Sequence, residues 1–149
     1  IRHAMKTVDG EARHQGIAIE TDLTAEIGKS PVCLDPDRIT QVFLNLCLNA
    51  IAAMGPGGLL RISLAAPDER TVRITVADTG AGIPKENLPR VFDPYFTTRP
   101  SGTGLGLAIV HKIIEGHGGE VRLESAVGQG TTVTILLPQT KDTERNNHP

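Results

Sequence analysis

The chain has 149 residues, a formal net charge of −2 and 39% hydrophobic residues. This length fits one domain with a sizeable core, and the near-neutral charge argues against nucleic acid or another polyanion as a partner. No apolar run is long enough to span a bilayer and no signal peptide opens the sequence, so we expect a cytoplasmic domain. Because the sequence starts at Ile1 rather than at a methionine, we expect it to be a piece of a longer protein.

The two cysteines, Cys33 and Cys47, lie in apolar stretches of the sequence. They lack the spacing that metal ligands require. We therefore expect both to be reduced thiols in the core of a cytosolic protein.

The first part of the sequence predicts a helix followed by two strands. Apolar residues recur at helical spacing over residues 1–15, and Gly16 is suited to end that helix. Residues 17–23 alternate as a strand, and residues 32–34 predict a short apolar strand. The run Gly28-Lys29-Ser30 is similar to the end of a phosphate-binding P-loop. We reject that interpretation because the earlier glycine is missing and Pro31 follows where a helix should begin.

Residues 35–54 predict a long buried helix with one polar stripe. Asp35 suits the N-cap, Pro36 suits the first helical position, and the glycine-rich run 55–58 ends the helix. The narrow polar wedge contains Arg38, Gln41, Asn45 and Asn49. Asn45 and Asn49 stand one turn apart on the same face, so their amides need partners, either nearby backbone or a ligand.

The middle of the sequence predicts two strands and then a long segment without periodicity. Residues 60–64 and 72–76 alternate as antiparallel strands joined by a turn at 67–70. Asp78 follows directly, and residues 84–101 show no periodicity, which indicates either a functional lid or a wrong assignment of this segment as structureless. Three aromatic residues of this lid, Phe92, Tyr95 and Phe96, predict a hydrophobic latch or a small cluster that pins the loop.

The last part predicts one helix and a closing pair of strands. Residues 102–107 open the helix and residues 116–119 end it. Its core-facing residues are predicted to be Leu105, Ala108, Ile109 and Ile113. Residues 121–123 and 133–137 predict the strands, and the polar tail 139–149 is expected to be disordered. Together the elements predict an α+β fold, a two-layer sandwich with about three helices on one face of a mixed sheet, in a single domain over residues 1–138.

Two features could carry chemistry. The glycine-rich loop 102–106 before a helix is suited to bind an anion, because free backbone amides and the helix dipole point at the ligand, although a tight turn alone would need none. Asp78 can accept a hydrogen bond from an exocyclic amine or form an ordinary Asx turn. A dinucleotide fold is disfavoured because neither glycine cluster lies in a strand–turn–helix–strand unit with an acidic residue at the expected distance.

Five motifs in a fixed order decide between these alternatives. They are Asn45 and Asn49, Asp78-Thr79-Gly80-Ala81-Gly82-Ile83, Phe92-Asp93-Pro94-Tyr95-Phe96, Gly102-Thr103-Gly104-Leu105-Gly106-Leu107, and Gly128-Gln129-Gly130-Thr131. This order resembles the catalytic, ATP-binding domain of two-component sensor histidine kinases, from the first helix to about Pro138. The residues around Asn49 and residues 91–98 are most similar to the nitrogen-regulation branch of that family.

The resemblance implies a Bergerat-type sandwich, the GHKL ATPase fold, with ATP and Mg²⁺ between the central helix and the lid. Asn49 would ligate Mg²⁺ with Asn45 in support, and Asp78 would accept from the adenine amine with Thr131 close by through water. One amide oxygen plus phosphates is a sufficient site, since Mg²⁺ keeps most of its waters. The implied nucleotide-binding residues are Asn45, Asn49, Asp78, Gly80, Gly82, Ile83, Phe92, Thr98, Arg99, Gly102, Thr103, Gly104, Leu105, Gly106, Leu107 and Thr131. The implied catalytic residues are Asn45, Asn49 and Arg99, and the implied metal ligand is Asn49.

The sequence departs from the family pattern at one position. Many members carry a lysine three residues after the metal-binding asparagine, but here that residue is Ala52, and Arg99 in the lid is the candidate replacement. Related ATPases of the gyrase and mismatch-repair type carry a glutamate in place of Asn45, and an amide cannot act as that general base. Hydrolysis is therefore expected to be slow, with the γ-phosphate kept for another acceptor.

The phosphoacceptor of the family is a histidine on a separate helical dimerisation domain, and none of the five histidines here has that context. The implied partners are this domain of the same parent protein and, downstream, a response regulator. The fragment is expected to be monomeric and the parent a homodimer, either soluble or membrane-anchored. Two alternatives remain: a serine kinase of the anti-sigma type, disfavoured by residues 92–96, and a nucleotide-binding module without transfer activity, disfavoured by the intact Asn45, Asn49 and Asp78.

Overall fold

The computed structural model describes residues 2–23 and 32–139, which form three α-helices, one 3₁₀ helix and five strands in those ranges. The elements are α1 (Arg2–His14), β1 (Ala18–Asp22), α2 (Pro36–Met54), β2 (Leu59–Asp68), β3 (Thr71–Asp78), the 3₁₀ helix η1 (Lys85–Arg90), α3 (Gly106–Gly116), β4 (Glu120–Ala126) and β5 (Gly130–Pro138). The rejected P-loop and residues 140–149 of the predicted tail lie outside the described residues. Gln139, the first tail residue, is buried, and its N–H donates to the Arg70 carbonyl at 2.7 Å.

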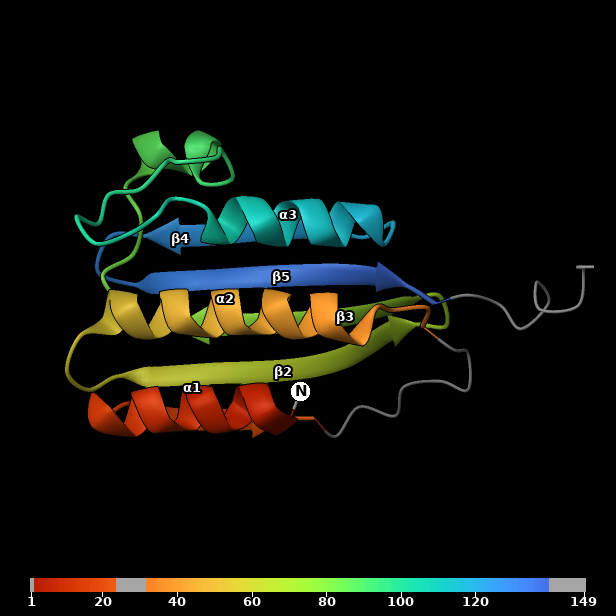
Figure 1. The fold of residues 1–149 in the computed structure, drawn as a ribbon, viewed down its shortest axis with the longest axis horizontal. Helices are drawn as coiled ribbons and strands as arrows, with labels where there is room; N and C mark the ends of the chain where they lie inside the picture. The colour runs from red at the N-terminus through yellow and green to blue at the C-terminus, as the bar shows by residue number, and fades with distance from the viewer. Residues whose placement is uncertain (1, 24–31, 140–149) are drawn as a thin grey trace, which may run out of the picture.

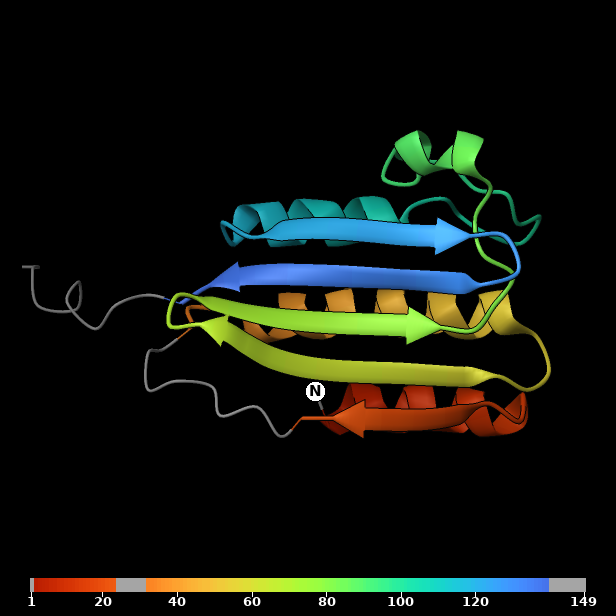
Figure 2. The same ribbon diagram turned by 180° about the vertical axis from the view of Figure 1, so that it is seen from behind.

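The strands form one mixed sheet in the order β1-β2-β3-β5-β4. β1 and β2 are parallel because the connection through α2 returns the chain to the same end of the sheet, and the other three pairs are antiparallel. The three α-helices cover one face of the sheet, as Figures 1 and 2 show from the two sides. The predicted two-layer α+β sandwich is therefore confirmed.

The core lies between the helices and the strand residues that alternate toward them. Leu60 and Ile62 of β2, Val76 of β3 and Ile135 of β5 are at most 4% exposed, and they meet buried residues of all three helices. On α2 the predicted apolar face is buried at Ile39, Val42, Leu46, Ala50 and Ile51. Helices thus press against a sheet whose inward positions are aliphatic, the arrangement that period-two and period-3.6 patterns require.

Three local predictions differ from the structure. Residues 32–34 are not a strand, and Cys33 is exposed rather than a core thiol, because the segment before α2 pairs with no strand of the described sheet. Cys47 is buried as predicted, and burial raises the pKa of its thiol to about 12. On α3 the fully buried residues are Val110, Ile113 and Ile114, while Leu105, Ala108 and Ile109 are only partly buried. The reason is that α3 packs against β4 as well as α2, which turns the Val110 and Ile114 side toward the interior.

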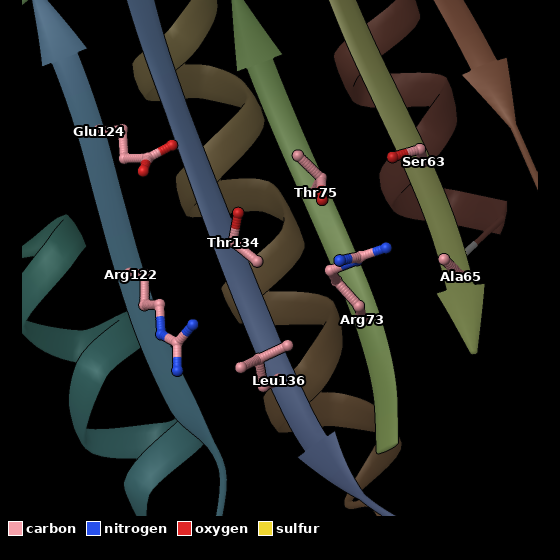
Figure 3. Close-up of a pocket in the computed structure, with 8 residues that line it drawn as sticks. All are labelled: Ser63, Ala65, Arg73, Thr75, Arg122, Glu124, Thr134 and Leu136. Atoms are coloured by element: carbon pink, nitrogen blue, oxygen red, sulfur yellow. The ribbon is translucent and has the colours of Figure 1, made fainter. Parts of the chain in front are cut away.

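The opposite face of the sheet is not covered by any described helix (Figure 2). Outward-pointing residues of β2, β3, β4 and β5 form a shallow pocket there (Figure 3). Its lining is Ser63, Ala65, Arg73, Thr75, Arg122, Glu124, Thr134 and Leu136. This pocket contains none of the predicted site residues, so the candidate site lies on the helical side of the molecule.

Candidate nucleotide-binding site

A cavity of about 730 Å³ opens where four elements end or begin at the same end of the molecule. Figure 1 shows the last turns of α2, the end of β3, the start of α3 and the start of β5 together there, with the lid beside them. This volume falls in the range of small-ligand sites. The predicted residues that line it are Asn45, Asn49, Asp78, Gly82, Ile83, Thr98, Arg99, Gly102, Thr103, Gly104, Gly106, Leu107 and Thr131.

Three predicted residues do not line the cavity, and several lining residues were not predicted. The three predicted residues outside the lining are Gly80, Phe92 and Leu105. The unpredicted lining is largely apolar and includes Leu46, Val76, Val91, Phe96, Leu123 and Val133. Val76 and Val133 could have been found from the sequence, since each stands two residues from a predicted polar residue on the same strand and therefore on the same face.

The stripe on α2 supplies two amides to the cavity. The helix is held in place at its start, where Asp35 Oδ1 accepts from the N–H groups of Asp37 at 3.0 Å and Arg38 at 3.1 Å. Three turns later, Asn49 Oδ1 accepts from Arg99 Nη2 of the lid at 2.8 Å. Asn45 Nδ2 is buried and has no hydrogen-bond partner among the described residues. A buried donor without a partner is costly, so the cavity is shaped for a ligand or water that accepts from it.

The polar residue at the end of β3 is fixed by backbone amides. Asp78 Oδ1 accepts from Gly80 N–H at 2.8 Å and from Thr131 N–H at 3.3 Å, and no described residue donates to Oδ2. Burial raises the pKa of the Asp78 carboxyl, and these two hydrogen bonds oppose the rise. Because β3 and β5 pair in register at Asp78 and Thr131, the two side chains are held beside each other by the sheet itself.

The loop after Asp78 depends on glycines for its close contacts. A Cβ on Gly80 would come within 2.7 Å of the Ala53 carbonyl oxygen, which accepts from Ala81 N–H at 3.0 Å and so closes the end of α2. Gly82 has φ +74°, and a Cβ there would collide with the carbonyl oxygen of Ala126. Lack of space thus excludes a side chain at Gly80, and both lack of space and backbone conformation exclude one at Gly82.

One aromatic contact anchors the lid to α3, and a second lies within the lid itself. The Phe92 ring packs against His111 of α3 with centroids 5.3 Å apart, and the Arg90 guanidinium lies 4.6 Å from the centroid of Phe96. Tyr95 is 77% exposed, so the predicted latch does not include it. Tyr95 adopts φ +66°, and its N–H donates to the Gly104 carbonyl at 2.8 Å. The segment predicted to lack periodicity also contains η1, so part of it is regular.

The glycine-rich loop brings the start of α3 against α2. Leu105 is the N-cap of α3 and makes no side-chain capping bond, so the first amides of the helix remain available. A Cβ on Gly106 would lie 3.1 Å from Asn49 Nδ2, so glycine allows the helix start to approach that amide. Free helix amides beside an amide oxygen and an arginine form an arrangement that suits phosphate groups.

Comparison with known proteins gives a consistent result. Residues 34–141 match the family model described as "Histidine kinase-, DNA gyrase B-, and HSP90-like ATPase". The chain is 44% identical over 138 residues to sensor histidine kinase ZraS of Escherichia coli (strain K12), covering 93% of this chain and 29% of ZraS. It therefore spans less than a third of the length of that relative.

Two solved structures with the same fold cover nearly the whole of this chain. The catalytic domain of histidine kinase ThkA superposes with a TM-score of 0.81 at 34% identity, covering 94% of this chain and 92% of that domain. Full-length ShkA in complex with AMPPNP superposes with a TM-score of 0.80 at 29% identity, covering 94% of this chain and 29% of that one.

Among the described residues no helix is long and apolar enough to cross a membrane. With its mixed sheet, its helical layer and its cavity between α2, α3 and the lid, the chain belongs to the histidine kinase-, DNA gyrase B- and HSP90-like ATPases, as a catalytic, ATP-binding domain of the sensor histidine kinase type.

Proposed function

We propose that this domain binds ATP with Mg²⁺ in the cavity and transfers the γ-phosphoryl group to a histidine on a dimerisation domain of its parent protein. The observation that carries the proposal is the polarity of the cavity. One end presents the Asp78 carboxylate among apolar strand residues, and the other presents Asn49, Arg99 and the free amides of α3. A nucleotide has the same division between its base and its phosphates.

At the base end, Asp78 would accept from the amine of adenine and Thr131 would lie beside it. Val76 and Val133 offer apolar contact to the faces of the ring, and the loop at Gly80 and Gly82 lets the backbone approach it. Ile83 lines the same end. Such a site rejects a base that places an acceptor opposite Asp78, because two acceptors would then face each other.

At the phosphate end, the residues that would bind the triphosphate come from the lid and the start of α3. Thr98, Gly102, Thr103, Gly104, Gly106 and Leu107 line this part of the cavity. Phe92 and Leu105 would support it through the His111 contact and the N-cap position. Backbone amides at a helix N-terminus bind phosphate oxygens without needing a basic side chain.

The residues present fit a magnesium ion held jointly with the phosphates. Asn49 supplies an amide oxygen directed into the cavity, and a single protein ligand suffices for an ion that otherwise holds phosphates and water. When bound, the ion would neutralise charge on the phosphates during transfer. Arg99 now donates to this same oxygen and would turn to the phosphates, so that it supplies the cation missing at Ala52.

Asn45 separates transfer from hydrolysis. Its amide cannot take a proton from water, and its buried Nδ2 can only donate. Asn45 would therefore orient the phosphates or a water on the metal, and ATP would persist until a histidine reaches the γ-phosphate. Two histidines of this chain have other contacts: His111 packs against Phe92, and His117 bridges Ile113 O at 2.7 Å and Asp35 N–H at 3.1 Å.

Within the parent, the dimerisation domain would present the acceptor histidine and a response regulator would take the phosphoryl group onward, in the cytoplasm. The test is to incubate the isolated chain, and the chain mixed with its parent's dimerisation domain, with ATP labelled at the γ position. Acid-labile label should appear on the dimerisation domain only. Acid-stable label on a serine substrate would instead support the anti-sigma type, and nucleotide binding without transfer would support the silent module.

A further inference from the structure

Ser125 of β4 lies outside the cavity and was not among the predicted site residues, yet it contacts both sides of the base end. Its Oγ accepts from the N–H of Ile83 at 2.8 Å, donates to the Gly130 carbonyl at 2.8 Å, and lies 2.8 Å from Thr131 Oγ1. The group is partly buried, so water competes weakly for these bonds. One hydroxyl thus joins the loop after Asp78 to the start of β5.

The direction of each bond follows from the chemistry of the partners. A carbonyl oxygen can only accept, so the single Ser125 proton goes to Gly130 O. The Ile83 N–H can only donate, so it uses one lone pair of Ser125 Oγ. The remaining lone pair faces Thr131, and a hydrogen bond forms there only if the Thr131 hydroxyl is the donor.

This assignment leaves Thr131 with no proton for the cavity. Thr131 lines the cavity beside Asp78, whose backbone pairing with it is fixed by the sheet. Its hydroxyl, with the proton committed to Ser125, can only accept from a ligand or a bridging water. Asp78 Oδ2 is likewise an acceptor with no described donor. Thr131 and Asp78, the two side chains that would contact the edge of the base, can then only accept hydrogen bonds from it.

We propose that Ser125 is a positioning residue that sets base specificity by committing the Thr131 hydroxyl as an acceptor, so that the site favours a purine with an amine at its six position over one with an oxygen there. Because this role presupposes an adenine nucleotide in the cavity, it rests on the proposed function. Ser125 itself touches no ligand. Its effect on base preference passes through Thr131, and this separates it from a residue that only holds the Ile83 loop.

The test compares binding of ATP and inosine triphosphate, which differ at the six position of the base and at the adjoining ring nitrogen. In Ser125→Ala the Thr131 hydroxyl no longer donates to Ser125. Its proton is then free to donate to the oxygen of inosine. The preference for ATP, expressed as the ratio of the two dissociation constants, should fall about three- to tenfold, the amount that one hydrogen bond contributes. Ser125→Thr keeps a hydroxyl at this position and should restore the preference.

Two controls separate this role from a structural one. Ser63→Ala removes a serine hydroxyl from the open face of the same sheet (Figure 3) and should leave the ratio unchanged. In a Thr131→Val background, Ser125→Ala should cause no further change in the ratio, because the hydroxyl through which it acts is gone. A residue that only held the Ile83 loop would weaken both nucleotides equally in either background.

The outcomes distinguish the two proposals. Suppose that wild type binds ATP but Ser125→Ala keeps the full wild-type ratio of dissociation constants, or changes that ratio equally in the wild-type and Thr131→Val backgrounds. The proposed role of Ser125 is then wrong, while the proposed function stands. If wild type binds neither nucleotide, the proposed function is wrong and this role with it. A loss of preference that depends on Thr131 supports both.

Discussion

The two ends of the cavity are built from different kinds of structure. At the base end, Asp78 and Thr131 lie on paired strands, and backbone amides and the Ser125 hydroxyl hold their side chains. At the phosphate end, Asn49 is on a helix, but its partner Arg99 comes from the lid. The lid also exposes the side chain of Tyr95. The base end is preorganised, whereas at the phosphate end one side-chain hydrogen bond joins the lid to α2.

This difference suits the two tasks that a phosphotransferase site must perform. Reading a base needs fixed donors and acceptors, because a group that can reorient discriminates poorly. Delivering a phosphoryl group to a second domain needs an opening at the γ-phosphate, so part of the wall there has to give way. A substitution at the phosphate end should therefore leave the preference for adenine intact. A substitution at the base end should leave the Mg²⁺ dependence of binding intact.

The largest effect is expected for Asn49→Ala at the phosphate end. Loss of residues around a metal site commonly lowers metal affinity or activity about ten- to a hundredfold, and removing the ligand itself should cost at least as much. The Mg²⁺-dependent part of ATP binding should disappear, while the preference for adenine remains. Titration calorimetry with and without Mg²⁺ measures this, with Asn49→Asp as the control that keeps an oxygen ligand. Equal Mg²⁺ dependence in Asn49→Ala and wild type would remove Asn49 from the site.

The next effect concerns Asp78→Asn at the base end. An ionised carboxylate can only accept, whereas an amide can turn to offer either a donor or an acceptor. A hydrogen bond to a charged group contributes about 1.5–3 kcal/mol, so the preference for ATP over GTP should narrow by roughly ten- to a hundredfold. Competition of both nucleotides against a fluorescent nucleotide measures it. If the mutant kept the full preference, adenine would be read elsewhere and Asp78 would be a turn residue.

A matched pair of glycines tests the rigidity of the base end. Gly82 and Gly128 both have positive φ, +74° and +78°, but only at Gly82 does a Cβ meet a neighbour, the Ala126 carbonyl. Gly128→Ala should cost about 1–2 kcal/mol of unfolding free energy from backbone strain alone. Gly82→Ala should cost about 1–3 kcal/mol more, because the loop after β3 must also move away from the end of β4. Urea unfolding of both variants gives the difference, and equal costs would show that the loop adapts freely.

The lid should respond to nucleotide more than any strand does. Lys85 and Arg90 are exposed trypsin sites in it, whereas Pro100 follows Arg99 and blocks cleavage there, and Arg99 is held by its hydrogen bond to Asn49. Limited digestion should cut the lid before the sheet and should slow several-fold at saturating ATP analogue with Mg²⁺. Digestion of Asn49→Ala provides the comparison, since its lid should gain less protection. Unchanged cleavage on adding nucleotide would argue against an ordering lid.

The smallest effect is the pH dependence of stability at Asp78. Since burial raises the pKa of this carboxyl, the native state holds the proton more tightly than the unfolded chain does. The contribution of Asp78 to stability is therefore greatest below its ordinary pKa of about 3.9 and falls as pH rises through the raised value. Asp78→Asn does not titrate, so the mutant should gain relative to wild type between acidic and neutral pH in urea unfolding without nucleotide. A relative loss would mean that the hydrogen bonds from Gly80 and Thr131 outweigh burial.

The sequence alone determined much of this molecule. Periodicity placed α2 with its cap at Asp35, and the spacing of Asn45 and Asn49 put two amides on one face before any fold was known. The order of the five motifs identified the family, because each motif is local and readable along the chain. The role of Arg99 as the cation in place of a lysine at position 52 stays a prediction, and in the structure Arg99 Nη2 donates to Asn49 Oδ1.

Only the tertiary structure decided which residues complete the site and how they are oriented. The pairing of Asp78 with Thr131, the apolar walls at Leu123 and Val133, and the three bonds of Ser125 join residues more than forty positions apart or on different strands. The exposure of Cys33 and Tyr95 and the buried side of α3 were decided in the same way. The physical reason is that a residue's own pattern sets its local conformation, whereas burial and hydrogen-bond direction depend on the partners that strand register and helix packing bring to it.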